Sequence, residues 1–221
     1  MRIEKILSHH VVFLVFQIIC FCHFVNAQES TVKSTLDDSV KSFLEKMRGT
    51  WSDMNVPASD GKILHDIIIK NNYKQALEIG TSTGHSGIWI AWALSKTGGK
   101  LITIEINEDR YTEALANFQE AGLSKYIDSR LADAHQLVKE LEGPFDFIFS
   151  DADKNWYKQY FIDLFPKLVV GGCFTAHNVS ERSWYGGGTA EYYEYVKKLP
   201  ELETTLDTSG AGIAISYKRK E

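Results

Sequence analysis

The stretch that most constrains the fold spans residues 75–95 and reads QALEIGTSTGHSGIWIAWALS. Residues 76–79 have the length and composition of a buried strand, and the second apolar run, 88–94, predicts a helix. Gly80 and Gly84 lie between them, where the chain can turn sharply and approach a ligand closely. Strand, glycine turn and helix in this order predict an α/β protein that binds a nucleotide-like ligand at the carboxyl end of its sheet.

The spacing within this turn narrows the class of ligand. The glycines follow G-x-x-x-G-x-x-G, with Glu78 inside the strand, whereas the dinucleotide fingerprint is G-x-G-x-x-G. An NAD-dependent oxidoreductase is therefore disfavoured. The helix start offers backbone N–H groups to a polar ligand, and Ser86 is placed to cap the helix or to bond that ligand. A tight turn without a ligand is the alternative for this stretch alone.

Length and charge set broader limits. The chain has 221 residues, which predicts one domain. Apolar residues make up 44% and charged residues 24%, a balance typical of globular rather than disordered chains. A net charge of −5 does not favour nucleic acid as a partner.

Residues 1–27 predict a secretory signal peptide. Arg2 and Lys5 form a positive start, 11–21 is almost wholly apolar, and 25–27 is a small-residue cleavage site. The alternative is an uncleaved anchor, but the apolar run is shorter than the ~20 residues that a spanning helix needs. We therefore expect a mature chain that begins at Gln28, is exported to the periplasm or secreted, and has no stable membrane insertion.

Residues 28–221 then form the single folded domain. Cleavage removes Cys20 and Cys22, so Cys173 has no partner for an internal disulfide. Further helices are predicted over 35–49, 58–70, 109–121, 156–168 and up to Leu199. Further strands are predicted over 100–106, 127–131, 145–150, 173–176, 202–206 and 213–217, the last two as a hairpin around Ser209 and Gly210. This alternation predicts a Rossmann-like, doubly wound α/β fold: a mostly parallel seven-stranded sheet with a C-terminal antiparallel hairpin.

Polar residues end successive strands of this predicted sheet. Glu105, Asp133, Asp151 and the pair His177 and Asn178 all fall where ligands bind in such folds. The Glu105 carboxylate can accept both hydroxyls of a ribose, and Asp133 lies where an adenine edge would lie. A solvated strand end is the alternative for any one of them, but four in succession predict a site.

Four segments together resemble the caffeoyl-CoA and catechol O-methyltransferases, which are class I S-adenosylmethionine-dependent enzymes. They are LEIGTSTGHS, ITIEINEDRY, FDFIFSDADKNWY and VVGGCFTAHN, and the resemblance runs from about Met54 to the C-terminus. It implies a small-molecule acceptor and allows a homodimer. It also implies that Asp151 is a metal ligand and that Lys154 is the base for the acceptor hydroxyl. The residues that it places against S-adenosylmethionine are Val56, Glu78, Gly80, Thr81, Ser86, Glu105 and Ala134.

The implied reaction moves a methyl group from S-adenosylmethionine to a hydroxyl of a small phenolic or catechol-like acceptor. Such an enzyme must mainly align the two reactants, and a base such as Lys154, or a metal, activates the hydroxyl. A structural ion pair with Asp151 or Asp153 is the alternative for Lys154. The alternative function is a non-catalytic exported binding protein that retains the fold, because the supply of S-adenosylmethionine outside the cytoplasm is unexplained.

His177 departs from the family pattern, which has Asp-Asn at the end of the fifth strand. Mg²⁺ prefers oxygen ligands, whereas imidazole suits softer transition metals. An ion held by Asp151, His177 and Asn178 is thus expected to be such a metal, and Mg²⁺ dependence is in doubt. Two other roles for His177 remain open: a general base in a metal-free enzyme, and a hydrogen-bonding residue in the wall of the site.

Aromatic residues near the catalytic strand ends predict the acceptor pocket. Trp156, Tyr157, Trp184 and Tyr185 would offer flat walls on which a phenolic acceptor stacks. For Trp156 and Tyr157 the alternative is the start of a core-facing helix.

Overall fold

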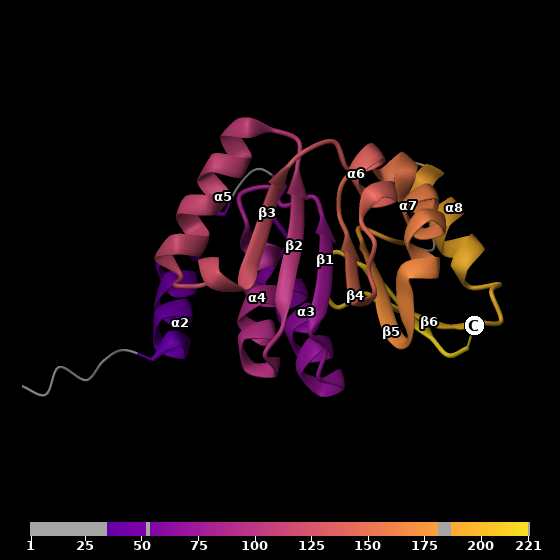
Figure 1. The fold of residues 1–221 in the computed structure, drawn as a ribbon, viewed down its shortest axis with the longest axis horizontal. Coiled ribbons are helices and arrows are strands. Elements are labelled where there is room, and N and C mark those ends of the chain that lie inside the picture. Colours follow the sequence, from indigo (N-terminus) through magenta and orange to yellow (C-terminus); the bar gives the residue numbers. More distant parts are fainter. Residues whose placement is uncertain (1–34, 52–53, 181–186, 221) are drawn as a thin grey trace, which may run out of the picture. The chain divides into compact units, whose positions relative to one another are not determined.

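The molecule is built on one seven-stranded sheet with the strand order β3-β2-β1-β4-β5-β7-β6 (Figure 1). The computed structural model describes residues 35–51, 54–180 and 187–220. Strands β1 to β5 are parallel, and β7 runs antiparallel between β5 and β6. This arrangement confirms the predicted fold. The strands are β1 (Gln75–Ile79), β2 (Lys100–Glu105), β3 (Ile127–Leu131), β4 (Phe145–Ser150), β5 (Leu168–His177), β6 (Leu202–Asp207) and β7 (Ile213–Lys218).

Helices cover both faces of this sheet (Figure 1). One face carries α3 (Ala58–Asn71), α4 (His85–Thr97) and α5 (Glu108–Glu120), with α2 (Leu36–Lys46) packed against α4 and α5. The other face carries α6 (Ala134–Glu140), α7 (Tyr157–Leu164) and α8 (Gly187–Val196). Single 3₁₀ turns are η1 (Ser124–Tyr126), η2 (Lys154–Trp156) and η3 (Phe165–Lys167).

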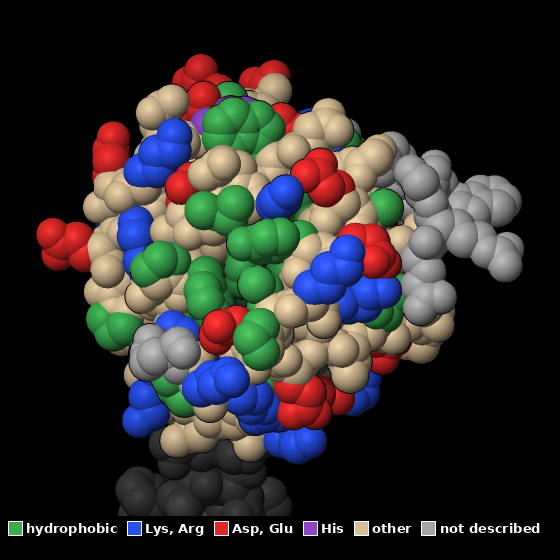
Figure 2. Space-filling model, turned by 90° about the vertical axis from the view of Figure 1, so that its right-hand side faces the viewer, with side chains coloured by type: hydrophobic (Ala, Val, Ile, Leu, Met, Phe, Trp, Pro, Cys, Tyr) green, Lys and Arg blue, Asp and Glu red, His purple; other side chains and the backbone are tan. Residues whose placement is uncertain are grey.

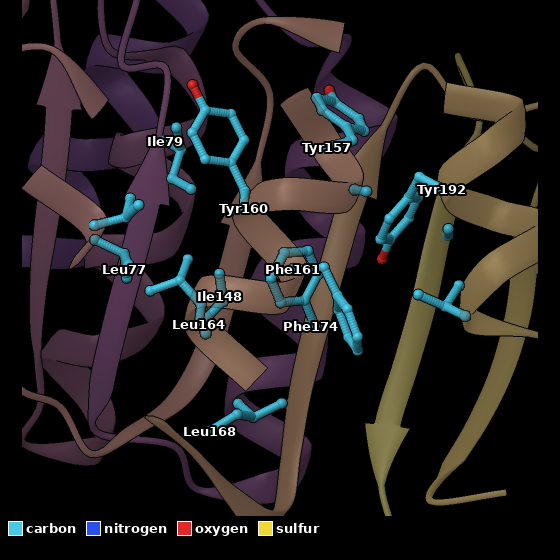
Figure 3. Close-up of a cluster of buried hydrophobic side chains, with 14 of the residues drawn as sticks. Leu77, Ile79, Ile148, Tyr157, Tyr160, Phe161, Leu164, Leu168, Phe174 and Tyr192 are labelled. Atoms are coloured by element: carbon cyan, nitrogen blue, oxygen red, sulfur yellow. The ribbon is translucent and has the colours of Figure 1, made fainter. Parts of the chain in front are cut away.

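The alternation of side chains along β1 explains the two buried layers. Leu77 and Ile79 point toward α6, α7 and α8, where they join Phe161 and Leu164 in one fully buried cluster (Figure 3). Ala76 points the other way and packs against α3 and α4. Each fully buried large apolar side chain contributes about 2 kcal/mol. With both faces buried, only the strand ends are left to build a polar site.

Helix α6 is missing from the prediction. Asp133, expected only as a ligand contact, is its N-cap residue: its side chain accepts a hydrogen bond from the backbone N–H of His135 at 2.9 Å. Val138 anchors this short helix in the core. An N-cap residue followed by apolar residues at helical spacing was the available signal.

Strand β5 begins earlier than predicted. The expected helix over 156–168 ends with η3, and the strand starts at Leu168 rather than Cys173. Gly171 (φ +84°) and Gly172 were expected to turn the helix into the strand. They lie instead in an irregular part of β5, where the pairing with β4 shifts register. A local glycine pair signals a special backbone conformation, but it does not distinguish a turn from a bulge.

The described residues from Leu36 onward form one compact unit. Over the described ranges, no helix is long and apolar enough to cross a membrane. The predicted signal peptide, residues 1–27, lies outside the described residues.

Candidate functional site

A cavity of about 740 Å³ opens at the carboxyl ends of the parallel strands. It lies at the edge of the sheet where the sequence placed the site, and segments from β1, β2, β4 and β5 all reach it. The predicted site residues that line it are Gly80, Glu105, Asp133, Ala134, Asp151, Lys154, His177 and Asn178.

The glycine turn brings two strand ends into contact at this cavity. Gly80 follows β1 with a φ of +96°, a conformation that favours glycine. A Cβ atom on Gly80 would lie 2.6 Å from the backbone oxygen of Asp151. The absence of a side chain at position 80 therefore lets the ends of β1 and β4 meet.

Glu105 forms part of the cavity wall and is almost fully buried. Its Oε2 accepts a hydrogen bond from the backbone N–H of Ser82 at 2.8 Å. Its Oε1 accepts from the N–H groups of Ile106 and Asn107, at 3.0 and 2.9 Å. The carboxylate thus joins the glycine turn to the β2–α5 loop, and its position is fixed before any ligand arrives.

The remaining predicted cofactor residues lie behind the glycine turn rather than on the cavity surface. Val56, Glu78, Thr81 and Ser86 are buried, and none of them lines the cavity. Ser86 does not cap α4, whose N-cap is Gly84; its hydroxyl hydrogen-bonds Glu78 instead.

Glu78 is the exceptional residue of this buried layer. It is fully buried, and no described residue hydrogen-bonds its Oε1. Burial raises the pKa of Glu78 to about 7, and hydrogen bonds from Ser86 and Thr103 offset this only in part. A fully buried carboxyl group with one oxygen left unsatisfied is unusual in a folded protein.

A second carboxylate, Asp151, lies where β4 ends. Its Oδ1 is paired with the Lys154 ammonium. Lys154 Nζ also donates to the Tyr157 hydroxyl at 2.8 Å, and that hydroxyl in turn donates to the backbone oxygen of His177 at 3.1 Å. Burial, followed by the charge of Asp151, raises the pKa of Tyr157 well above its usual value, so the hydroxyl stays protonated. The ion pair with Asp151, which was the structural alternative to a base role for Lys154, is therefore present.

His177 lies between two carboxylates. Its Nδ1 is 3.0 Å from Asp151 Oδ2, and its Nε2 is 2.9 Å from Asp60 Oδ2. Burial alone lowers the pKa of His177, but the two carboxylates outweigh it and raise the pKa above its usual value. Both ring nitrogens of His177 are therefore in contact with carboxylates.

The residues expected to bind a metal do not fit one in this arrangement. Imidazole coordinates a metal through a lone pair on one nitrogen, and both nitrogens of His177 are in contact with carboxylates. Asp151 is engaged through both oxygens, by His177 and Lys154. Among the described residues, no group of three or more His, Cys, Asp or Glu side chains is arranged to hold an ion.

Neither described residue of the predicted aromatic acceptor wall, Trp156 or Tyr157, lines the cavity. Tyr157 is fully buried in the core cluster and does not line the cavity (Figure 3), so the core-facing alternative is correct for this residue. Trp156 is half-buried, and its ring lies 4.0 Å from that of the cavity residue His135. Trp184 and Tyr185 lie outside the described residues.

Sequence reasoning missed two side chains of this region. His135 lines the cavity directly after the predicted Asp133 and Ala134 and stacks on Tyr160. Asp60 is fully buried in the first turn of α3 and meets His177 across 117 positions of sequence. No local signal marks Asp60, because an acidic residue in the first turn of a helix is commonplace.

Comparison with known proteins agrees with this geometry. A family model described as O-methyltransferase matches residues 28–205. Caffeoyl-CoA O-methyltransferase 1 of Eucalyptus globulus is 36% identical over 188 residues, which are 75% of each chain. A catechol O-methyltransferase of Niastella koreensis is 41% identical over 112 residues, covering 49% of this chain and 50% of the relative.

A solved structure shares the fold. The O-methyltransferase TomG from Streptomyces achromogenes, determined in complex with SAM, superposes with a TM-score of 0.71 at 24% identity. The match covers 89% of this chain and 95% of TomG.

Proposed function

This chain belongs to the O-methyltransferase family, and we propose that it methylates a hydroxyl of a small phenolic or catechol-like acceptor with S-adenosylmethionine as donor. The observation that carries the proposal is the meeting of Gly80, Glu105 and the Asp151–Lys154 pair around one cavity. The relatives, which include caffeoyl-CoA and catechol O-methyltransferases, support the acceptor class.

The donor end of the cavity fits S-adenosylmethionine. Glu105 lies where the two hydroxyls of a ribose can be accepted, and its carboxylate is already oriented by three backbone N–H groups. His135 adds an aromatic surface beside Asp133 and Ala134 for an adenine ring.

The acceptor end provides a base. The Lys154 ammonium first releases a proton to solvent, and its free amine then takes the hydroxyl proton. The acceptor oxygen forms a bond to the methyl carbon, and the bond from that carbon to sulfur breaks to leave a neutral thioether. The resulting Lys154 ammonium is stabilised by Asp151, and this ion pair is the state seen in the structure. Bound donor supplies an activated methyl group, and the protein contributes alignment and proton transfer.

Calorimetry and a turnover assay test the proposal together. The mature chain should bind S-adenosylmethionine and convert a catechol to its methyl ether. Glu105→Ala should weaken donor binding at least tenfold, or about 1.4 kcal/mol, because charge-assisted bonds to the ribose are lost. Glu113→Ala, at an exposed position of α5 away from the cavity, is the matched control and should bind as the parent does.

The outcomes separate the candidate functions. Binding without methylation of any catechol or simple phenol would favour the non-catalytic binding protein. An unchanged affinity in folded Glu105→Ala would remove this residue from the donor site.

A further inference from the structure

Three buried side chains form a charged array beside the proposed reaction site. Asp60, His177 and Asp151 have side chains that are 0%, 4% and 9% exposed. They come from the first turn of α3, the end of β5 and the end of β4. A buried array of this kind is costly unless its charges compensate one another.

Both ring nitrogens of His177 are engaged by carboxyl groups of this array. A neutral imidazole carries one N–H and one lone pair, so it can donate to only one of its two carboxylate neighbours. Imidazolium donates to both, and both distances, 2.9 and 3.0 Å, are within hydrogen-bond range. If instead one of the two carboxyl groups holds the second proton, it donates that proton in a hydrogen bond to the imidazole nitrogen and occupies the nitrogen's lone pair. In either arrangement no lone pair is left for a metal.

Asp60 is held in place independently of His177. Its Oδ2 also accepts from the backbone N–H of Ala211 at 3.0 Å, and its Oδ1 accepts from the Ser59 hydroxyl at 2.9 Å. A Cβ on Gly210 would lie 1.5 Å from Asp60 Oδ1. The loop between β6 and β7 therefore closes on this carboxylate, and only glycine fits there.

We propose that His177, clamped between Asp60 and Asp151, replaces the divalent metal of related O-methyltransferases, so that this chain works without a metal ion. The His177 ring stands at the position of the family's fifth-strand Asp, and both of its nitrogens are in contact with carboxylates. Lys154 is paired with the other oxygen of Asp151. Asp60 acts as a positioning residue that fixes His177 and, through it, Asp151. This inference rests on the proposed function in one respect: its activity measurements are informative only if the chain methylates a catechol.

The first test measures metal binding on the substrate-free protein, so it needs no turnover. Chelator-treated wild type should bind neither Mg²⁺ nor Mn²⁺ at millimolar concentration in calorimetry. His177→Asp, which creates an all-oxygen set with Asp151 and Asn178, should gain one metal ion per chain. His65→Asp, a histidine change on α3 outside the cavity, should gain none. One ion bound per wild-type chain would overturn the proposal.

The second test uses activity and a spectroscopic signature. Metal-stripped wild type should keep full activity toward a catechol, and recovery only on adding a metal would overturn the proposal. Asp60→Asn should lower kcat at least tenfold with little change in the affinity for S-adenosylmethionine, whereas exposed Asp66→Asn on the same helix should alter neither. In ¹H–¹⁵N spectra of histidine-labelled protein, the ring-nitrogen signals of His177 should shift in Asp60→Asn, which changes the partner of Nε2, and should stay unchanged in Asp66→Asn. If His177→Asp fails to fold, the wild-type and Asp60→Asn measurements still decide.

Discussion

At the residue scale, Glu78 shows how a site can lower stability. Its carboxyl group is fully buried, and its pKa is raised from 4.5 to about 7, chiefly by burial. The folded chain therefore holds a proton that the unfolded chain releases between those two pH values. Stability is then lost as the pH rises from about 4.5 to 7. Proteins tolerate such a cost where the group serves a ligand.

We expect Glu78→Gln to relieve this loss. The amide keeps an oxygen for Ser86 and Thr103 but carries no charge, so the ligand-free variant should be more stable than wild type at pH 8. The raised pKa corresponds to roughly 3 kcal/mol as an upper limit. Urea unfolding at pH 5, 6, 7 and 8 should show the difference shrinking toward pH 5. Exposed Glu113→Gln is the control, and a difference that does not change with pH would contradict the explanation.

At the scale of elements, the turn between β1 and α4 governs how close the strand ends approach. Gly80 has a positive φ and no room for a Cβ beside Asp151. Gly98, at the other end of α4, has a φ of +79° with nothing within 4 Å of a Cβ. Both glycines need a positive φ, but only Gly80 lacks the space for a Cβ atom.

This pair gives a matched prediction. Gly98→Ala should lower the free energy of unfolding by about 1 kcal/mol, the cost of a left-handed conformation in alanine. Gly80→Ala should cost a further ~1–3 kcal/mol because the new methyl group overlaps the Asp151 carbonyl. It should also weaken S-adenosylmethionine binding, whereas Gly98→Ala should not. Equal losses of stability in the two variants would show that the close contact has no energetic weight.

At the scale of the whole molecule, charge gives no sign of a nucleic-acid partner. The net charge is −5, and on the face shown in Figure 2 basic and acidic side chains are interspersed around a small apolar area. A protein that neutralises phosphates needs a basic stripe, and this face has none.

Export of the protein is a second prediction at the scale of the whole molecule. We propose that residues 1–27 are removed, on the basis of the charged start, the apolar run and the small residues at 25–27. N-terminal sequencing of protein from the producing cell should begin at or near Gln28, and an intact Met1 in the cytoplasmic fraction would contradict export. Cys173 is the one cysteine of 28–221 and is buried, so a reductant should leave the Tm of the mature chain unchanged.

Features that depend on local order could be predicted from the amino-acid sequence. Hydrophobic periodicity predicted the alternating strands and helices, and the glycine spacing around Gly80 distinguished this turn from a dinucleotide site. Since parallel strands end at the same edge of a sheet, the polar residues that follow them could be assigned to one cavity from chain order. These residues are Glu105, Asp133, Asp151 and His177.

The partners of these residues follow only from long-range packing. Asp60 reaches His177 because α3 packs beside the end of β5 and the β6–β7 loop closes over it, and no pattern in neighbouring residues encodes that meeting. The same packing buries Tyr157, which the sequence left open as either pocket wall or core. Side-chain chemistry follows from residue identity. Whether a histidine nitrogen is free to bind a metal depends on the carboxylates that the folded chain brings to its two nitrogens.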